Sequence, residues 1–217
     1  MFQQTTIDGD HNIGLYGFAT DRYCCVGASH KTLEKTLQVK LHVGSVFGTP
    51  FVGMFCTGNS AGMMAARMAQ EYTEGLGVDH ALFLDTEFTA LGNLVVMNDH
   101  GIVVSPLLRR HANAIEAFFG VPVAVSRIGG SSLAGSVCVA TNKGCLWHPR
   151  ARDHEIALLE KTLTVAVAVG TVSFGSPFVK AGLLVNSKGF VVSPSTTGIE
   201  MGRITEALGF LEGRQHS

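Results

Sequence analysis

Charged residues are scarce in this sequence. Lys, Arg, Asp and Glu make up 15% of its 217 residues, and 16 basic residues against 17 acidic ones leave a net charge of -1. A protein that binds nucleic acid mainly through phosphates carries a basic excess. Any contact of this chain with a macromolecule is therefore expected to go through protein surface. The hydrophobic fraction of 46% is typical of a folded chain with little disorder.

Long apolar runs are also missing. Gly and polar residues interrupt every hydrophobic stretch before it reaches the roughly 18 residues that span a bilayer. Residues 1–12 lack the basic and apolar regions of a secretory signal. These absences favour a cytosolic protein.

Cysteines are few, odd in number and without a C-x-x-C pair. They are Cys24, Cys25, Cys56, Cys138 and Cys145. Neither a disulfide framework nor a zinc ribbon is indicated, and reduced thiols are expected.

An internal repeat organises the second half of the chain. Three polar turns end in Gly, and a Pro follows each Gly five residues later: 98–101 with Pro106, 141–144 with Pro149, and 186–189 with Pro194. An apolar run precedes and follows each turn. Because a turn that contains Asn and ends in Gly supplies the positive φ of tight connections, each segment predicts a hairpin.

A helix and a third strand are expected after each hairpin. The predicted helices are 108–119, 153–159 and 200–208, the last opening with the capping-box spacing of Thr197 and Glu200. The closing strands are 121–125 and 165–172. Their alternation of apolar and small residues favours burial on both faces.

Two weaker copies precede these three. They supply the helices 29–36 and 65–76 and the strands 23–26, 37–46 and 78–85. The fifth copy lacks a closing strand, which residues 2–7 can provide, and this would close a ring without open edges. The alternative is an open sheet of two or three separate βαβ-like units.

The predicted fold is thus one α/β domain over residues 1–217. Five ββαβ-like repeats form a closed ring, a five-fold α/β propeller in which the N-terminal strand completes the last blade. The approximate repeats are 8–47, 48–88, 89–129, 130–173 and 174–217, plus strand 2–7.

Several motifs resemble the translation initiation factor 6 family. They are Thr89-Ala90-Leu91-Gly92-Asn93 with Asn98-Asp99, Thr141 to Leu146 with His148-Pro149, and Ser195 to Gly198 before Glu200, together with Ile13-Gly14 and Tyr23-Cys24 near the start. The resemblance covers essentially the whole chain and implies the propeller called the pentein fold. The ending at Ser217 is similar to archaeal members. Residues 62–67 lack the Pro that the family tends to keep, which leaves the start of the second helix open.

The resemblance also implies a function. Members of the family bind the inter-subunit face of the large ribosomal subunit and keep the small subunit from joining by steric occlusion. Their contact is mostly with a ribosomal protein beside the sarcin-ricin loop, with some ribosomal RNA at the rim. The resemblance implies a monomer without cofactor, DNA partner or membrane partner, and it leaves a role in subunit biogenesis open.

The loops that enter the blades are the candidate ribosome-binding segments, because a ring of repeats presents equivalent loops on one face. The candidates are Asn12, Ile13, Gly14, Thr49, Phe51, Leu91, Gly92, Asn93, Ser132, Leu133, Ser176 and Phe178. Asn93 is the leading candidate for contact because it lies in the family motif. Alternatively, Gly92-Asn93 makes a turn with positive φ, which Asn suits.

An apolar patch is expected among these candidates. Exposed Leu91, Leu133 and Phe178 would together mark an interface. Structural roles are the alternative for Thr49, Ser132 and Phe178.

Cysteine and histidine raise an enzyme hypothesis. Other pentein proteins are deiminases and amidinotransferases that act on guanidino groups through a Cys nucleophile, a His and carboxylates. That Cys resembles a last-blade feature, yet residues 174–217 contain none. Cys145 and His148 are two potential metal ligands, whereas a tetrahedral site needs three or four. The sequence favours a binding factor without catalytic or metal residues; a guanidino enzyme and a structural protein without ribosome contact are the alternatives.

Overall fold

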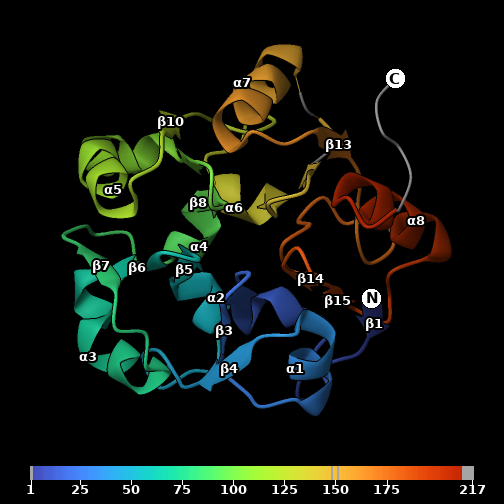
Figure 1. The fold of residues 1–217 in the computed structure, drawn as a ribbon, viewed down its shortest axis with the longest axis horizontal. Coiled ribbons are helices and arrows are strands. Elements are labelled where there is room, and N and C mark those ends of the chain that lie inside the picture. Colours follow the sequence, from blue (N-terminus) through green and yellow to red (C-terminus); the bar gives the residue numbers. More distant parts are fainter. Residues whose placement is uncertain (1, 148, 151, 212–217) are drawn as a thin grey trace.

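Five three-stranded sheets stand around a central axis in the computed structural model, which describes residues 2–147, 149–150 and 152–211 (Figure 1). The sheets consist of Gly17–Ala19 (β2), Tyr23–Val26 (β3) and Lys40–Val43 (β4); Thr57–Asn59 (β5), Gly62–Ala66 (β6) and Ala81–Leu84 (β7); Val95–Met97 (β8), Ile102–Val104 (β9) and Val123–Val125 (β10); Cys138–Ala140 (β11), Cys145–Trp147 (β12) and Val167–Val169 (β13); and Leu183–Val185 (β14), Phe190–Val192 (β15) and Phe2–Gln4 (β1).

Every sheet is a hairpin joined by one parallel strand. In the third sheet, Val103 pairs antiparallel with Val96 and parallel with Ala124. The parallel partner of β15 is the N-terminal strand β1, with Gln3 opposite Val191. The predicted five-fold fold, with the N-terminal strand completing the last blade, is confirmed, and the open-sheet alternative is wrong.

One set of helices occupies the rim of the ring, and short helical turns lie near its centre (Figure 1). The outer helices are Lys31–Leu37 (α1), Gln70–Thr73 (α3), Ala112–Phe119 (α5), Asp153–Leu163 (α7) and Gly198–Ala207 (α8), and the inner turns are Ile13–Leu15 (η1), Val52–Phe55 (α2), Leu91–Leu94 (α4) and Ala134–Val137 (α6). The capping box of α8 is present as expected. In the described part of the chain, no helix has the length and hydropathy of a transmembrane segment.

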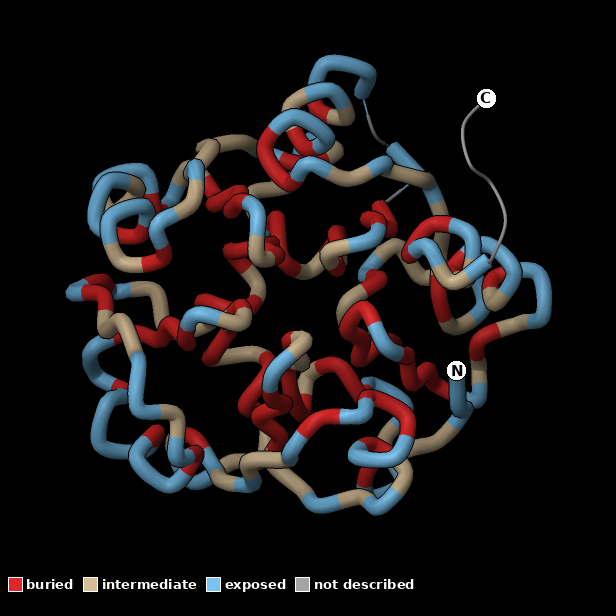
Figure 2. Tube along the Cα trace, viewed as in Figure 1, coloured by how far each residue is buried: buried red, intermediate tan, exposed pale blue. Residues whose placement is uncertain are grey.

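Each blade has its own hydrophobic core between sheet and helix. In the third blade Ile102, Leu108 and Ile115 are fully buried, and in the fourth Trp147 and Leu159 are buried. Burial of one such side chain stabilises a fold by about 1.5–3 kcal/mol. Figure 2 shows this burial along the inner strands and exposure along the outer helices.

Two expectations about local structure are wrong. The closing strands are not buried on both faces: β10 is only partly buried, and Val169 of β13 is 41% exposed. The reason is that the third strand of each sheet is its outer edge. The helix expected at 65–76 starts later, because Ala65 and Ala66 pair with Phe83 and Leu84 in β6 and β7.

The second outer helix is also broken. Arg67–Ala69 (η2) and Glu74–Leu76 (η3) are 3-10 turns on either side of α3. A similar turn, Pro106–His111 (η4), precedes α5. In contrast, α7 runs as far as Leu163, beyond the expected end at 159.

Candidate functional site

The blade-entering loops meet around one end of the central channel. Their inner turns touch in sequence, η1 with α2, α2 with α4, and α4 with α6. A methyl group on Gly53 would overlap the carbonyl oxygen of Gly14, one on Gly92 that of Gly53, and one on Gly135 that of Gly92. Glycine therefore allows the close approach that gathers these loops on one face.

The twelve predicted residues all lie in these loops, but their exposure differs. Asn12, Leu133 and Phe178 are exposed. Partly exposed are Thr49, Phe51, Asn93, Ser132 and Ser176, and buried are Ile13, Gly14, Leu91 and Gly92. The structure thus brings the candidates to one end of the ring, and their role in binding stays a prediction.

The expected exposure of Leu91 is wrong. Its side chain is fully buried in the core of the third blade with Met64 and Leu94. In the short helix α4, Gly92 faces the neighbouring loop, so Leu91 is turned into the blade. Because of that burial, Leu91→Ala is expected to destabilise the fold itself.

The alternative of a positive-φ turn at Gly92-Asn93 is also wrong. Both residues lie within α4, and neither has a positive φ. The Asn93 side chain is partly exposed and makes no hydrogen bond to another residue in the described ranges. Asn93 is therefore available for contact.

Hydroxyl groups hold several of the loops in shape. The Thr49 hydroxyl accepts a hydrogen bond from the Phe51 N–H at 3.4 Å, and the Ser176 hydroxyl accepts one from the Phe178 N–H at 3.3 Å. Such turns are typical of Ser and Thr. These two hydroxyls have structural roles. Of the aromatic side chains that follow them, Phe178 is 50% exposed, whereas Phe51 packs against Tyr16 and the core of the first blade.

Phe174 is an exposed aromatic residue that the sequence did not indicate. It is 79% exposed and has a φ of +61°. A bulky residue in that region is strained, and strain of this kind gathers at functional sites. With Leu133 at 41% and Phe178 at 50% exposure, it is one of three exposed apolar side chains on the loops that enter the fourth and fifth blades, which we together call the apolar patch.

A buried carboxylate holds the loop of Phe174. Glu200 accepts hydrogen bonds from the Thr171 hydroxyl, the Gly175 N–H and the Thr197 N–H, each at 2.8 Å, and from the Phe174 N–H at 3.3 Å. Burial alone raises the pKa of Glu200, but these hydrogen bonds outweigh it and hold the pKa below its ordinary value. The loop that carries Phe174 is thus held in one conformation.

At the opposite end of the channel, hydrogen bonds of polar side chains join one blade to the next. Asn98 donates to the carbonyls of Thr141 and Leu163 at 3.0 and 2.9 Å. Asn142 bridges the carboxylates of Asp21 and Asp99 at 2.8 and 2.7 Å. The polar side chains of these turns thus connect neighbouring blades.

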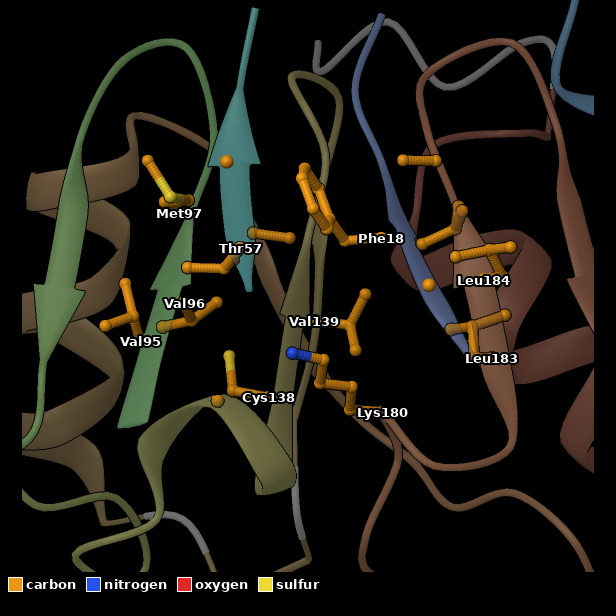
Figure 3. A pocket seen from close by; sticks show the side chains of 16 residues that line it. Phe18, Thr57, Val95, Val96, Met97, Cys138, Val139, Lys180, Leu183 and Leu184 are labelled. Atoms are coloured by element: carbon orange, nitrogen blue, oxygen red, sulfur yellow. The ribbon is translucent and has the colours of Figure 1, made fainter. Parts of the chain in front are cut away.

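The interior of the ring contains a lysine. Figure 3 shows Lys180 extending into a cavity of about 60 Å³ between the inner strands. Its ammonium donates to the carbonyl of Gly92, across the ring, at 2.5 Å. Burial lowers the pKa of Lys180 to about 7, and the nearby Cys56 thiol opposes that shift.

The cysteines lack the surroundings of a nucleophile. Burial raises the pKa of Cys24 and of Cys56 to about 12. The Cys138 and Cys145 thiols contact each other at 3.2 Å inside the fourth blade. Within the described ranges, no group of three His, Cys, Asp or Glu could hold a metal ion. His148, considered above as a metal ligand, lies outside the described residues.

Comparison with known proteins agrees with the resemblance seen in the motifs. The model of the eIF-6 family matches residues 2–207. Translation initiation factor 6 of Methanoculleus marisnigri is 37% identical over 217 residues, which cover 95% of this chain and 99% of the relative. The protein of the same name from Thermococcus onnurineus is 37% identical over 92% and 94% of the two chains, and that from Methanosarcina acetivorans 39% identical over 83% of each. The chain belongs to the eIF-6 family.

Proposed function

We propose that this protein binds the large ribosomal subunit at its inter-subunit face and keeps the small subunit from joining. Its relatives are named translation initiation factor 6. The observation that carries the proposal is the apolar patch of Leu133, Phe174 and Phe178, on the face where the candidate loops converge. With a net charge of -1, a protein surface beside the sarcin-ricin loop is the main partner, and ribosomal RNA contributes at the rim.

The mechanism is steric. The hydrogen bonds of Glu200 hold the Phe174 loop before binding, so little conformational entropy is lost when a partner covers the patch. The bound ring then occupies the surface that the small subunit needs. We place the protein in the cytosol as a monomer that needs no cofactor, with subunit biogenesis as a further role.

Subunit joining tests this proposal. Sucrose gradients with purified archaeal large subunits are expected to show stoichiometric binding, and light scattering a loss of joining when small subunits are added. The enzyme alternative predicts ammonia or urea from arginine or agmatine, which the buried, protonated thiols of Cys24 and Cys56 argue against. Absence of subunit binding would refute the proposal.

Substitution of the patch is expected to weaken subunit binding. Phe174→Ser with Phe178→Ser removes two exposed aromatic side chains, and loss of such anchors reduces affinity by at least about tenfold. Thermal stability should change little because Phe174 is 79% and Phe178 is 50% exposed. Affinity is measured by co-sedimentation with large subunits.

The matched control for the patch is Ile199→Ser. Ile199 is 85% exposed at the start of α8, next to Glu200, so this variant tests whether exposed apolar area near the Phe174 loop counts in general or whether Phe174 and Phe178 count specifically. The control variant should have the same affinity for large subunits as the wild type. Equal affinities of the double variant and the wild type would show that the patch is outside the interface.

A further inference from the structure

Lys180 stands where the other four blade-entering loops have glycine. Gly14, Gly53, Gly92 and Gly135 are each second in the short turn before an inner strand, and Lys180 holds that place in the fifth loop. A side chain at the four glycines would overlap backbone of a neighbouring loop. The fifth loop instead admits a long cationic side chain into the centre of the ring.

Among the residues that the structure describes, the Lys180 ammonium has a single hydrogen-bond acceptor, the Gly92 carbonyl at 2.5 Å. The residue lines both the channel cavity of about 60 Å³ and a hollow of about 140 Å³ at its mouth. Among the described residues, no Asp or Glu lines either space. A buried ammonium without countercharge is unfavourable, so it loses its proton or acquires an anion.

The hollow contains further hydrogen-bond donors. Asn93 and Ser136 line it, and the side chain of neither residue bonds to another residue in the described ranges, so the Asn93 amide and the Ser136 hydroxyl are available as donors. The Lys180 backbone N–H donates to the Ser136 carbonyl at 3.3 Å, which fixes the two loops side by side. Leu15, Phe178 and Ala181 form the remaining, apolar wall. Donors on one side and hydrocarbon on the other suit a carboxylate with a short apolar stem.

We propose that this hollow is a binding site for one carboxylate group. Its oxygens accept hydrogen bonds from the Lys180 ammonium, the Asn93 amide and the Ser136 hydroxyl, and its hydrocarbon lies against Phe178 and Leu15. The carboxylate belongs either to a small monocarboxylate in solution or to an acidic side chain of the partner on this face. The site goes beyond the proposed function, since it exists whether or not the ring binds ribosomes.

Carboxylate binding at this site depends on pH. Burial lowers the pKa of Lys180 to about 7, so the ammonium form is complete only in mildly acidic solution. The titratable groups facing it are the thiols of Cys56 and Cys138, whose pKa values are raised by burial, so both are neutral. Binding therefore weakens as the pH rises above about 7 and Lys180 loses its proton.

Acetate is the probe for this site. Calorimetric titration of the full chain at fixed ionic strength is expected to show saturable acetate binding at about pH 6 and at least about tenfold weaker binding at about pH 8.5. Lys180→Met is expected to reduce binding at the lower pH by at least the same factor. Asn93→Ala, which removes a partly exposed side chain, should weaken it severalfold and covers the case in which Lys180→Met fails to fold.

The control is Lys188→Met in the same blade. Lys188 is an exposed lysine of the hairpin turn at the opposite end of the ring, and its loss should leave acetate binding unchanged. Absence of saturable binding by the wild type, or equal binding by Lys180→Met, overturns the proposal.

Large subunits distinguish the two sources of the carboxylate. If the partner supplies it, acetate competes with subunit binding and Lys180→Met weakens that binding. If a solution carboxylate fills the hollow, subunit affinity is the same with and without acetate. A wild type that binds acetate but no subunits contradicts the proposed function and leaves the carboxylate site standing.

Discussion

Replacement of Gly92 by alanine is expected to unfold the ring or to destabilise it by more than roughly 3 kcal/mol. The added methyl group would overlap the Gly53 carbonyl and would lie 2.7 Å from the Lys180 ammonium and 2.9 Å from the Cys56 carbonyl. Two of these neighbours are backbone and cannot rotate away. Since whole domains are stable by only about 5–15 kcal/mol, such a loss is measurable by urea denaturation.

Gly202→Ala is the matched control for this prediction. Gly202 lies in the exposed middle of α8, and a methyl group there meets no atom within 4 Å. Alanine in a helix interior is more favourable than glycine by about 0.5–1 kcal/mol, so this variant should be slightly more stable than the wild type. If Gly92→Ala unfolded at the same urea concentration as the wild type, the glycine contacts would not be what closes the ring.

The repeat could be predicted from the sequence because hairpins have local signals. The structure has the predicted hairpin turns, which end at Gly101, Gly144 and Gly189, and the predicted strand Tyr23–Val26. Closure of the ring by residues 2–7 could be predicted because the fifth repeat lacks a closing strand of its own. The helix expected at 65–76 failed because pairing of β6 with β7 extends the strand through Ala66, a tertiary effect that helix propensity does not report.

Exposure in the candidate loops was harder to predict. Leu91 and Phe178 are similar residues in similar loops, yet one is fully buried and the other is 50% exposed. The difference arises from position in the loop: with Lys180 aligned to Gly92, Leu91 corresponds to Val179, which is also fully buried, and Phe178 lies one residue earlier. The strain at Phe174 has a parallel in the second copy, where Phe47 also precedes Gly with a positive φ, whereas Asp8 and Gly129 hold that place in two other copies. Alignment of the five loops, however, would have singled out Lys180 as the residue in place of glycine.

Loss of the Glu200 carboxylate is expected to destabilise the fifth blade. Glu200→Ala leaves the Thr171 hydroxyl and the Gly175 and Thr197 N–H groups without their acceptor. Partly buried donors without an acceptor and the loss of the side-chain half of the capping box together reduce the free energy of unfolding by about 1–3 kcal/mol. The variant should also bind large subunits less tightly than the wild type at a temperature where both are folded, because Phe174 is no longer held. Glu116→Ala on the exposed face of α5 is the control and should change stability by less than about 0.5 kcal/mol.

The loss of stability in acid is expected to depend on the carboxylate of Glu200. The pKa of Glu200 lies below its ordinary value of 4.5 in the folded protein, so its ionised form stabilises the fold above that pH. This contribution is lost as the pH falls through the lower, folded pKa. The wild type should therefore lose stability more steeply below about pH 4.5 than Glu200→Gln, which keeps the shape but cannot titrate. Parallel pH profiles of the unfolding free energy for the two proteins would mean that Glu200 acts only as a neutral hydrogen-bond acceptor. The rigidity of the patch would then not depend on its charge.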